Sequence, residues 1–188
     1  MIADDILEMI EMGSIEEVWD FHCRRMAEYG FDRILFVNTR FKTSNSLGPM
    51  EDALILASHP GDYVERFFGE GHYLHGPMMR WCLENRGVCS WNWIREQHEL
   101  GRFNEKELRT LALNREYGVT AGYTICFKCG SARSLSGIGL TARRGLSQPE
   151  VDRLWVENER DLKLYNKILH LKISSLPQGA EDRLTDRQ

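Results

Sequence analysis

Apolar residues recur three or four positions apart in six segments of the chain, and this spacing predicts six amphipathic helices. Two of them lie within residues 1–29, where Gly13 and Ser14 interrupt the pattern and Ser14 forms a capping box with Glu17. The other four cover residues 61–68, 77–85, 104–117 and 148–174. In the segment 104–117 the predicted apolar stripe consists of Leu108, Leu111, Ala112 and Tyr117.

Five shorter apolar segments lack helical spacing and predict strands, at residues 32–37, 53–57, 88–93, 119–127 and 135–142. A loop at residues 42–50 separates the first two, which are therefore expected to pair antiparallel. In the last segment, Gly137 and Gly139 lie two positions apart and hence on the same face of the sheet. Their missing side chains leave room there for the close approach of another group.

The stretch from His59 to Trp93 is rich in histidine, tyrosine and tryptophan, side chains that join an apolar body to a polar tip. This composition is typical of the wall of a small-molecule pocket. A plain hydrophobic core is the alternative, although it would favour Leu, Ile and Val over His and Tyr. The histidines of the stretch, His59, His72 and His75, include no pair four apart on a helix, so no metal site is expected.

Composition indicates one globular domain that does not itself bind nucleic acid. Of the 188 residues, 42% are hydrophobic and 28% charged, and the formal net charge of -4 lacks the basic excess of a DNA-binding domain. Five cysteines, no signal peptide and no long apolar run predict a cytoplasmic protein with reduced thiols and no membrane partner. No cofactor is expected, and Cys126 and Cys129 are interpreted as buried or edge-strand thiols.

The order and spacing of these residues also match a known pattern. Residues 14–175 resemble the autoinducer-binding domain of LuxR-type quorum-sensing transcription regulators. That family has a Trp, a Tyr four positions later, an Asp-Pro pair nine positions further on, a Trp fifteen positions after the Asp, and an E-x-G-x-x-x-G-x-T block. The same spacing is occupied here by Tyr63, Phe67, Gly76-Pro77, Trp91 and residues 116–124. The first Trp, the Tyr and the Asp of the family are thus replaced.

The resemblance implies roles for three of these positions. The first aromatic of the family donates to the lactone carbonyl of an N-acyl homoserine lactone, and the residue four before it donates to the acyl carbonyl. Those positions are Tyr63 and His59, and both side chains can still donate. The family Asp accepts from the ligand amide N–H, for which Gly76 has no side chain. Either His75 or a backbone carbonyl replaces this acceptor, or the signal is a different lipid-like or aryl molecule without the amide.

The resemblance further implies the fold and the partners. The expected fold class is α/β, an α/β/α sandwich with a central antiparallel sheet of about five strands, similar to GAF and PAS domains. A small-molecule signal, an acyl homoserine lactone or an analogue, would lie between the sheet and the helices of residues 60–117. Residues 1–176 would form the sensory domain, and residues 177–188 a linker and the start of a helix-turn-helix domain. DNA would be reached only through that missing domain.

A homodimer is expected, formed through the long last helix. Apolar residues occupy more than one face of this helix, and an exposed apolar face on that scale usually marks an interface. The residues concerned are Val151, Leu154, Trp155, Leu162, Leu164, Ile168, Leu169, Leu171 and Ile173. Deeper burial of the helix within the domain is the alternative explanation.

Pocket composition and resemblance together predict one ligand-binding set. It comprises His59, Tyr63, Phe67, His75, Gly76, Trp81, Trp91, Phe103, Tyr117, Gly139 and Thr141. Two other functions stay open. An enzyme would use His75 or His59 as general base and Cys82 or Cys89 as nucleophile. A ligand-independent interaction module would fill the pocket with its own side chains and only dimerise.

Overall fold

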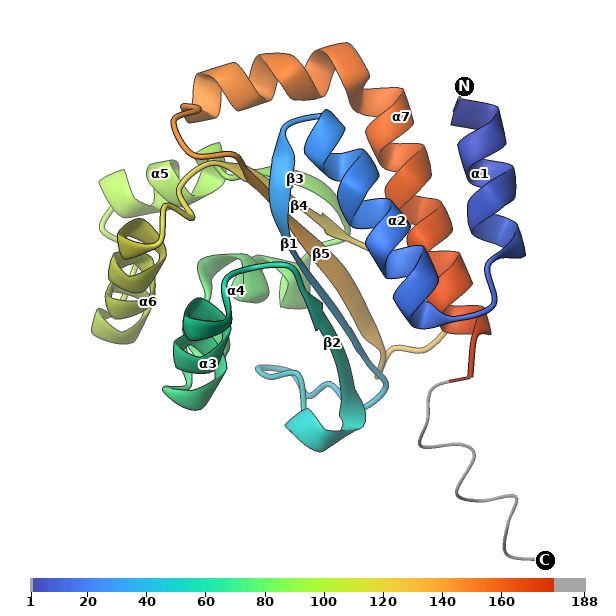
Figure 1. Cartoon of the computed structure of the whole chain (residues 1–188). Helices are drawn as coiled ribbons and strands as arrows, with labels where there is room; N and C mark the ends of the chain where they lie inside the picture. Colours follow the sequence, from blue (N-terminus) through green and yellow to red (C-terminus); the bar gives the residue numbers. More distant parts are fainter. Residues whose placement is uncertain (1, 178–188) are drawn as a thin grey trace, which may run out of the picture.

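A central antiparallel sheet separates two layers of helices in the computed structural model, which describes residues 2–177 (Figure 1). The five strands lie in the order β2-β1-β5-β4-β3. Their bounds are Phe31–Thr39 for β1, Ala53–Ala57 for β2, Gly87–Ser90 for β3, Gly122–Cys126 for β4 and Leu135–Ala142 for β5. The predicted α/β/α sandwich and the antiparallel pairing of β1 with β2 are therefore confirmed.

One helical layer is made from the two ends of the described chain (Figure 1). It contains α1 (Ile2–Glu11), α2 (Ile15–Glu28) and α7 (Gln148–Ser175). The capping box predicted at Ser14 forms, because the Ser14 hydroxyl accepts from Glu17 N–H and the Glu17 carboxylate accepts from Ser14 N–H. This layer covers the main hydrophobic core against β1 and β5.

The middle of the chain supplies the opposite layer. It contains α3 (Gly61–Gly69), α4 (Pro77–Glu84), α5 (Asn92–Glu99) and α6 (Glu105–Glu116), with 3-10 turns at Met50–Asp52 and His72–His75. Pro77 begins α4, where its missing N–H costs nothing. This layer holds the aromatic stretch that begins at His59 against the other face of the sheet (Figure 1).

Strand alternation decides which side chains face which layer, because successive residues of a strand point to opposite faces. In β1, Ile34 and Phe36 belong to the core under α2 and α7. Leu35 and Val37 point the other way and line a cavity under the second layer. The cavity-facing positions of β5 include Gly137 and Gly139, which the sequence pattern had placed together on one face of the sheet.

Two predictions of secondary structure and packing were wrong. The segment 88–93 is extended only as far as Ser90, since α5 begins at Asn92 and adds a helix that the sequence pattern did not predict. In α6 the buried face carries Glu107, Thr110 and Leu113, whereas Leu108 of the predicted stripe is 41% exposed. Polar bonding explains the inverted face, because Glu107 pairs with Arg80 at 2.8 Å and Thr110 bonds His72 at 3.0 Å.

The long helix α7 buries one stripe and exposes another. Trp155, predicted as part of an interface, is only 4% exposed and stacks on Tyr123 with a ring separation of 4.1 Å. Val156, Leu164 and Leu171 are exposed. Deeper burial thus accounts for much of the breadth of the apolar pattern, and a smaller apolar surface is left over.

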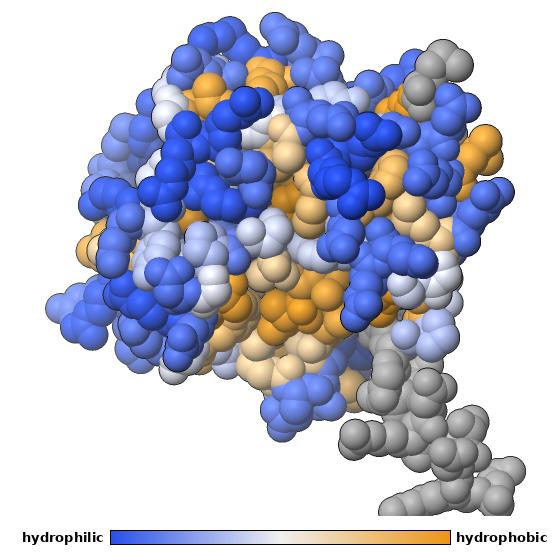
Figure 2. All heavy atoms as spheres, in the orientation of Figure 1, coloured by the Kyte–Doolittle hydropathy of each residue, from blue (hydrophilic) through white to orange (hydrophobic). Residues whose placement is uncertain are grey.

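The molecular surface is mostly hydrophilic in Figure 2, with an apolar area where Figure 1 draws β2. This strand is a sheet edge, and its residues Leu54, Ile55 and Leu56 are all half-buried. No helix within residues 2–177 has both the length and the apolar content that a membrane span requires. The expected linker and domain start at residues 177–188 lie, from 178 on, outside the described residues.

Candidate functional site

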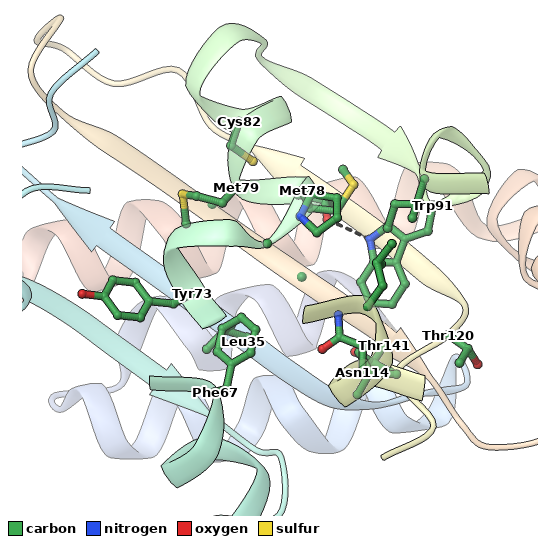
Figure 3. Close-up of a pocket in the computed structure, with 18 of the residues that line it drawn as sticks. Leu35, Phe67, Tyr73, Met78, Met79, Cys82, Trp91, Asn114, Thr120 and Thr141 are labelled. Carbon is green, nitrogen blue, oxygen red and sulfur yellow. Dashed lines mark hydrogen bonds between the residues drawn. The ribbon is translucent and has the colours of Figure 1, made fainter. Parts of the chain in front are cut away.

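A cavity of about 430 Å³ lies between the sheet and the second helical layer (Figure 3). Its volume falls within the range of about 300–1,000 Å³ that is usual for small-molecule sites. Apolar side chains form most of the wall, and they come from β1, α3, α4, α5 and β5. Among them are Leu35, Val37, Leu47, Phe67, Phe68, Tyr73, Met78, Met79, Cys82, Trp91, Ile94, Val119 and Leu135.

A row of stacked rings crosses one wall of the cavity. The rings of His59 and Tyr63 stack at 4.8 Å and those of Tyr63 and Phe67 at 5.4 Å. Tyr63 and Phe67 share a face of α3 because they lie four positions apart, and His59 precedes this helix. The Tyr63 hydroxyl donates a hydrogen bond of 2.9 Å to Oδ1 of Asn114 in α6. This bond fixes the Asn114 amide, whose nitrogen points in Figure 3 toward the open space between Leu35 and Trp91.

Trp91 forms the opposite side of the cavity and is held by a hydrogen bond. Its indole N–H donates to Oγ1 of Thr124 at 2.9 Å, the dashed line in Figure 3. The ring lies over β4 and β5 at glycines: a Cβ on Gly122 would come within 3.0 Å of it, and one on Gly139 within 3.9 Å. The missing side chain at Gly122 is what lets the indole approach the sheet closely.

Two buried polar atoms on the cavity wall lack hydrogen-bond partners among the described residues. They are Nδ1 of His59 and Oγ1 of Thr141, and Thr141 is almost fully buried. Burial lowers the pKa of His59 to about 4, with the nearby Arg33 guanidinium lowering it further, so the imidazole is neutral at pH 7. Unpaired buried polar groups are costly, and a bound ligand is one means of pairing them.

Beside His59, the buried Arg33 holds three separate segments together. Its Nη1 donates to the carbonyl oxygens of Tyr117 and Gly118, both at 3.1 Å, and its Nη2 donates to Ala142 O at 2.5 Å. With its donors occupied by carbonyls, Arg33 supports the polar end of the cavity rather than lining it. No sequence pattern indicated this role, because the carbonyls come from distant positions.

At Gly76, where the resembling family has Asp, the structure has space. A Cβ there would meet Met79, Phe67 and the Tyr73 carbonyl at 3.9 Å each, which is ordinary contact. The backbone at Gly76 is extended, with φ of -65°, and the residue caps the N-terminus of α4. An aspartate is therefore sterically possible, and its absence is a chemical difference rather than a consequence of crowding.

Seven of the eleven predicted ligand-binding residues line this cavity. They are His59, Tyr63, Phe67, Gly76, Trp91, Gly139 and Thr141. The other four do not: Trp81 packs with a cluster around Cys82, Phe103 lies against Trp93 and His98, the Tyr117 hydroxyl donates to Asp62, and His75 ends a 3-10 turn. His75 adjoins Gly76 in the chain but is not among the residues that line the cavity.

Sequence reasoning missed Asn114, Met78, Thr124 and Gln148, which also line the cavity. Asn114 lies three positions after Leu111, so the helical spacing could have placed both on one face. The wrong apolar stripe assigned to this helix hid that signal. Gln148 could not have been found, because only the fold brings the start of α7 beside β4, where Gln148 bonds both backbone groups of Gly122.

Neither candidate nucleophile, Cys82 or Cys89, has the lowered thiol pKa that a catalytic cysteine needs. Burial raises the pKa of the Cys89 thiol to about 11, and that of Cys82 is raised mainly by its hydrogen bond with Cys126 and by burial. Both are therefore protonated at neutral pH, while the thiolate is the reactive form. Within the described chain neither thiol bonds a histidine, and no cluster of three His, Cys, Asp or Glu residues is suited to a metal ion.

A family model described as "Autoinducer binding domain" matches residues 14–173. A search of curated proteins gives no significant match. Among solved structures, the N-acylhomoserine lactone-dependent LuxR-family transcription factor CepR2 of Burkholderia cenocepacia is similar with a TM-score of 0.66 and 14% identity, over 93% of this chain and 97% of that one.

Escherichia coli SdiA is also similar, with a TM-score of 0.56 and 15% identity over 88% of this chain and 67% of SdiA. A structure of SdiA in complex with octanoyl-rac-glycerol gives a TM-score of 0.55 at 15% identity, over 88% and 66% of the two chains. At such identities these likenesses concern the fold.

Proposed function

The chain belongs to the autoinducer-binding domain family, and on that premise we propose that its cavity binds one small lipophilic signal, an N-acyl homoserine lactone or an analogue with an acyl chain. The domain is a ligand-sensing module of the LuxR type. Its role as a sensor rather than an enzyme is supported by Cys82 and Cys89, whose raised pKa values keep both thiols protonated at neutral pH.

The separation of polar and apolar groups within the cavity carries the proposal. In Figure 3 the sulfur-containing side chains Met79 and Cys82 lie on one side, whereas Asn114 and Thr141 lie on the other, below Trp91. Such a wall suits a molecule with a hydrocarbon tail and a compact polar head. The unpaired Thr141 hydroxyl is on the polar side, and the ring of His59, whose Nδ1 is also unpaired, stacks on Tyr63, which bonds Asn114.

A self-filled, ligand-independent module is not favoured, because that alternative requires the aromatic side chains to close the pocket. Tyr63, Phe67 and Trp91 instead surround an open volume of about 430 Å³. Trp81, which was also expected to fill it, packs elsewhere.

Native mass spectrometry of the protein produced in its own host tests the proposal. We expect a population with a bound small molecule that is lost on denaturation. A matched variant, Gly139→Trp, places a large ring in the cavity, where a Cβ has ordinary contacts at 3.9 Å, and should lack the adduct. Recovery of only unliganded wild-type protein, together with no binding of added acyl lactones or acyl esters, would contradict the proposal.

Communication of ligand binding to a helix-turn-helix domain is part of the same proposal. Gln148, at the start of α7, lines the cavity and bonds Ser90 and Asp152 as well as Gly122. Occupancy of the cavity is therefore expected to slow amide hydrogen exchange at the start of α7, the last described helix. Exchange in α7 that is identical with and without a saturating ligand would argue against this route.

A further inference from the structure

The polar end of the cavity is rich in hydrogen-bond donors. Because the Tyr63 hydroxyl donates to Oδ1 of Asn114, the two N–H groups of that amide are turned to the cavity and have no partner among the described residues. The Thr141 hydroxyl is unpaired and can donate as well. A ligand oxygen that accepts hydrogen bonds would satisfy both groups.

Strong acceptors are missing from the same wall. None of the described residues that line the cavity is an aspartate or a glutamate. Gly76 adds no side chain, and the groups around it are Phe67, Met79 and a backbone carbonyl of Tyr73. An amide N–H on the ligand would therefore enter without a carboxylate partner, and an N–H left unpaired costs about 5- to 150-fold in affinity.

The lack of free charged groups inside the cavity also restricts the kind of ligand that it can bind. The interior polar groups, His59, Asn114 and Thr141, are neutral at pH 7, and the buried Arg33 has its donors occupied by carbonyl oxygens. A buried carboxylate on the ligand would lose its hydration without gaining an unoccupied cation in the interior. The arginines of the lining, Arg95 and Arg115, are exposed and offer only weak, screened attraction.

We infer that the signal is a neutral acyl ester, a hydrocarbon chain whose head carries acceptor oxygens but no N–H, and that Asn114 binds its carbonyl oxygen. The inference rests on the proposed function, since it assumes that this cavity holds an acyl ligand. Asn114 would donate to the ester carbonyl while Tyr63 holds the amide in orientation. Thr141 and His59 would pair with the remaining oxygens of the head.

Titration calorimetry with three ligands of equal chain length tests the ligand class on the purified protein. The ligands are the octanoyl ester of α-hydroxy-γ-butyrolactone, N-octanoyl homoserine lactone and octanoate. The ester differs from N-octanoyl homoserine lactone only in the oxygen that replaces the amide N–H, and it is expected to bind at least about fivefold more tightly because it brings no unpaired N–H. N-Octanoyl homoserine lactone or octanoate that binds as tightly as the ester overturns the inference. No binding of any of the three overturns the proposed function itself.

Two variants test the contact with Asn114. Asn114→Asp keeps the acceptor for Tyr63 but removes the two donors, so the octanoyl ester should bind about fivefold or more weakly. Asn45→Asp is the matched control: it makes the same charge change at an exposed loop position whose Oδ1 accepts from Thr43, and it should leave the affinity unchanged. Equal affinity for the ester in Asn114→Asp and wild type overturns the role of Asn114.

Gly76→Asp restores an acceptor where the structure has space for one. It is expected to raise the affinity for N-octanoyl homoserine lactone by about fivefold or more and to change that for the octanoyl ester little. Circular dichroism checks that the variant is folded, which the extended backbone at this position and the preference for Asp at helix N-caps favour. A folded variant with unchanged lactone affinity overturns the explanation based on the missing acceptor.

Discussion

The Tyr63 hydroxyl links α3 to α6 at the cavity wall through its bond to Asn114. Tyr63→Phe removes this bond and frees the Asn114 amide to rotate. The free energy of unfolding should fall by about 0.5–1.5 kcal/mol, and ligand affinity should weaken because the amide is no longer oriented. Urea denaturation and calorimetry measure the two effects.

Tyr117→Phe is the matched control for this residue. The Tyr117 hydroxyl also bonds across elements, to Asp62, but at an exposed position outside the cavity lining. It should leave ligand affinity unchanged. If the two variants weaken the ligand equally, the special role of the Tyr63 hydroxyl is disproved.

His22 makes stability depend on pH. Complete burial lowers its pKa from 6.5 to about 3, against the opposing effect of its hydrogen bond to Asn166. Below pH 6.5 the unfolded chain takes up a proton at His22 while the folded chain does not, so stability is lost as the pH falls toward 3. From pH 6.5 to about pH 5 the loss is on the order of 2 kcal/mol.

Chemical denaturation of wild type and His22→Gln at several pH values checks this expectation. Glutamine is neutral and can still bond Asn166, so the variant should lose less stability on acidification than the wild type. Because the other titrating groups are common to both proteins, their contribution cancels in the comparison. Parallel pH profiles would show that His22 does not cause the loss.

The neighbouring strands β4 and β5 differ in the space that each leaves for a side chain at its glycine under Trp91. A Cβ on Gly122 would lie 2.2 Å from Leu140 O, whereas one on Gly139 has no neighbour nearer than 3.9 Å. Gly122→Ala is therefore expected to destabilise the fold by about 3 kcal/mol or more, because the sheet must open to admit it. Gly139→Ala should leave stability within about 1 kcal/mol.

Thermal unfolding of the two alanine variants measures the contrast. Both place the same methyl group on adjacent strands, so any general preference for alanine over glycine cancels. Nearly equal melting temperatures would mean that the sheet under Trp91 yields more readily than its close backbone contact indicates.

For the whole molecule, self-association through α7 stays a prediction, on a smaller surface than the sequence pattern suggested. Leu164 and Leu171, seven positions apart and so on one face of α7, are exposed, and α1 exposes Leu7 and Ile10. The end of α7 lies beside α1, because Lys172 Nζ donates to Ile10 O. We expect sedimentation over a roughly hundredfold concentration range to detect a dimer.

Leu171→Glu should shift that equilibrium to monomer without unfolding the chain, since Leu171 is 53% exposed. Leu108→Glu, at an exposed leucine of α6 in the opposite layer, is the matched control and should dimerise like the wild type. Trp155→Glu is unsuitable, because that side chain is buried against Tyr123. A monomeric wild type at every concentration contradicts the prediction.

Local chemistry allowed much of the molecule to be predicted from sequence. The capping boxes at Ser14 and Asn104, the proline that begins α4 and the alternating apolar strands act over a few residues, so they can be recognised in the chain itself. The resemblance carried by Tyr63 and Trp91 added the order of the sandwich. These features were enough to predict the fold, and seven of the eleven predicted ligand-binding residues line the cavity.

Tertiary structure alone decided what depends on distant partners. The buried face of α6 is set by Arg80 and His72, which bond Glu107 and Thr110 from other elements. The orientation of Asn114 comes from Tyr63, and the positions of Trp81 and Phe103 outside the cavity come from packing with residues far from the aromatic stretch. Hydrogen bonds and contacts between remote segments produce no periodic pattern in a sequence. The sequence could therefore predict that aromatic residues line the cavity, but not which polar groups of the wall remain free for a ligand.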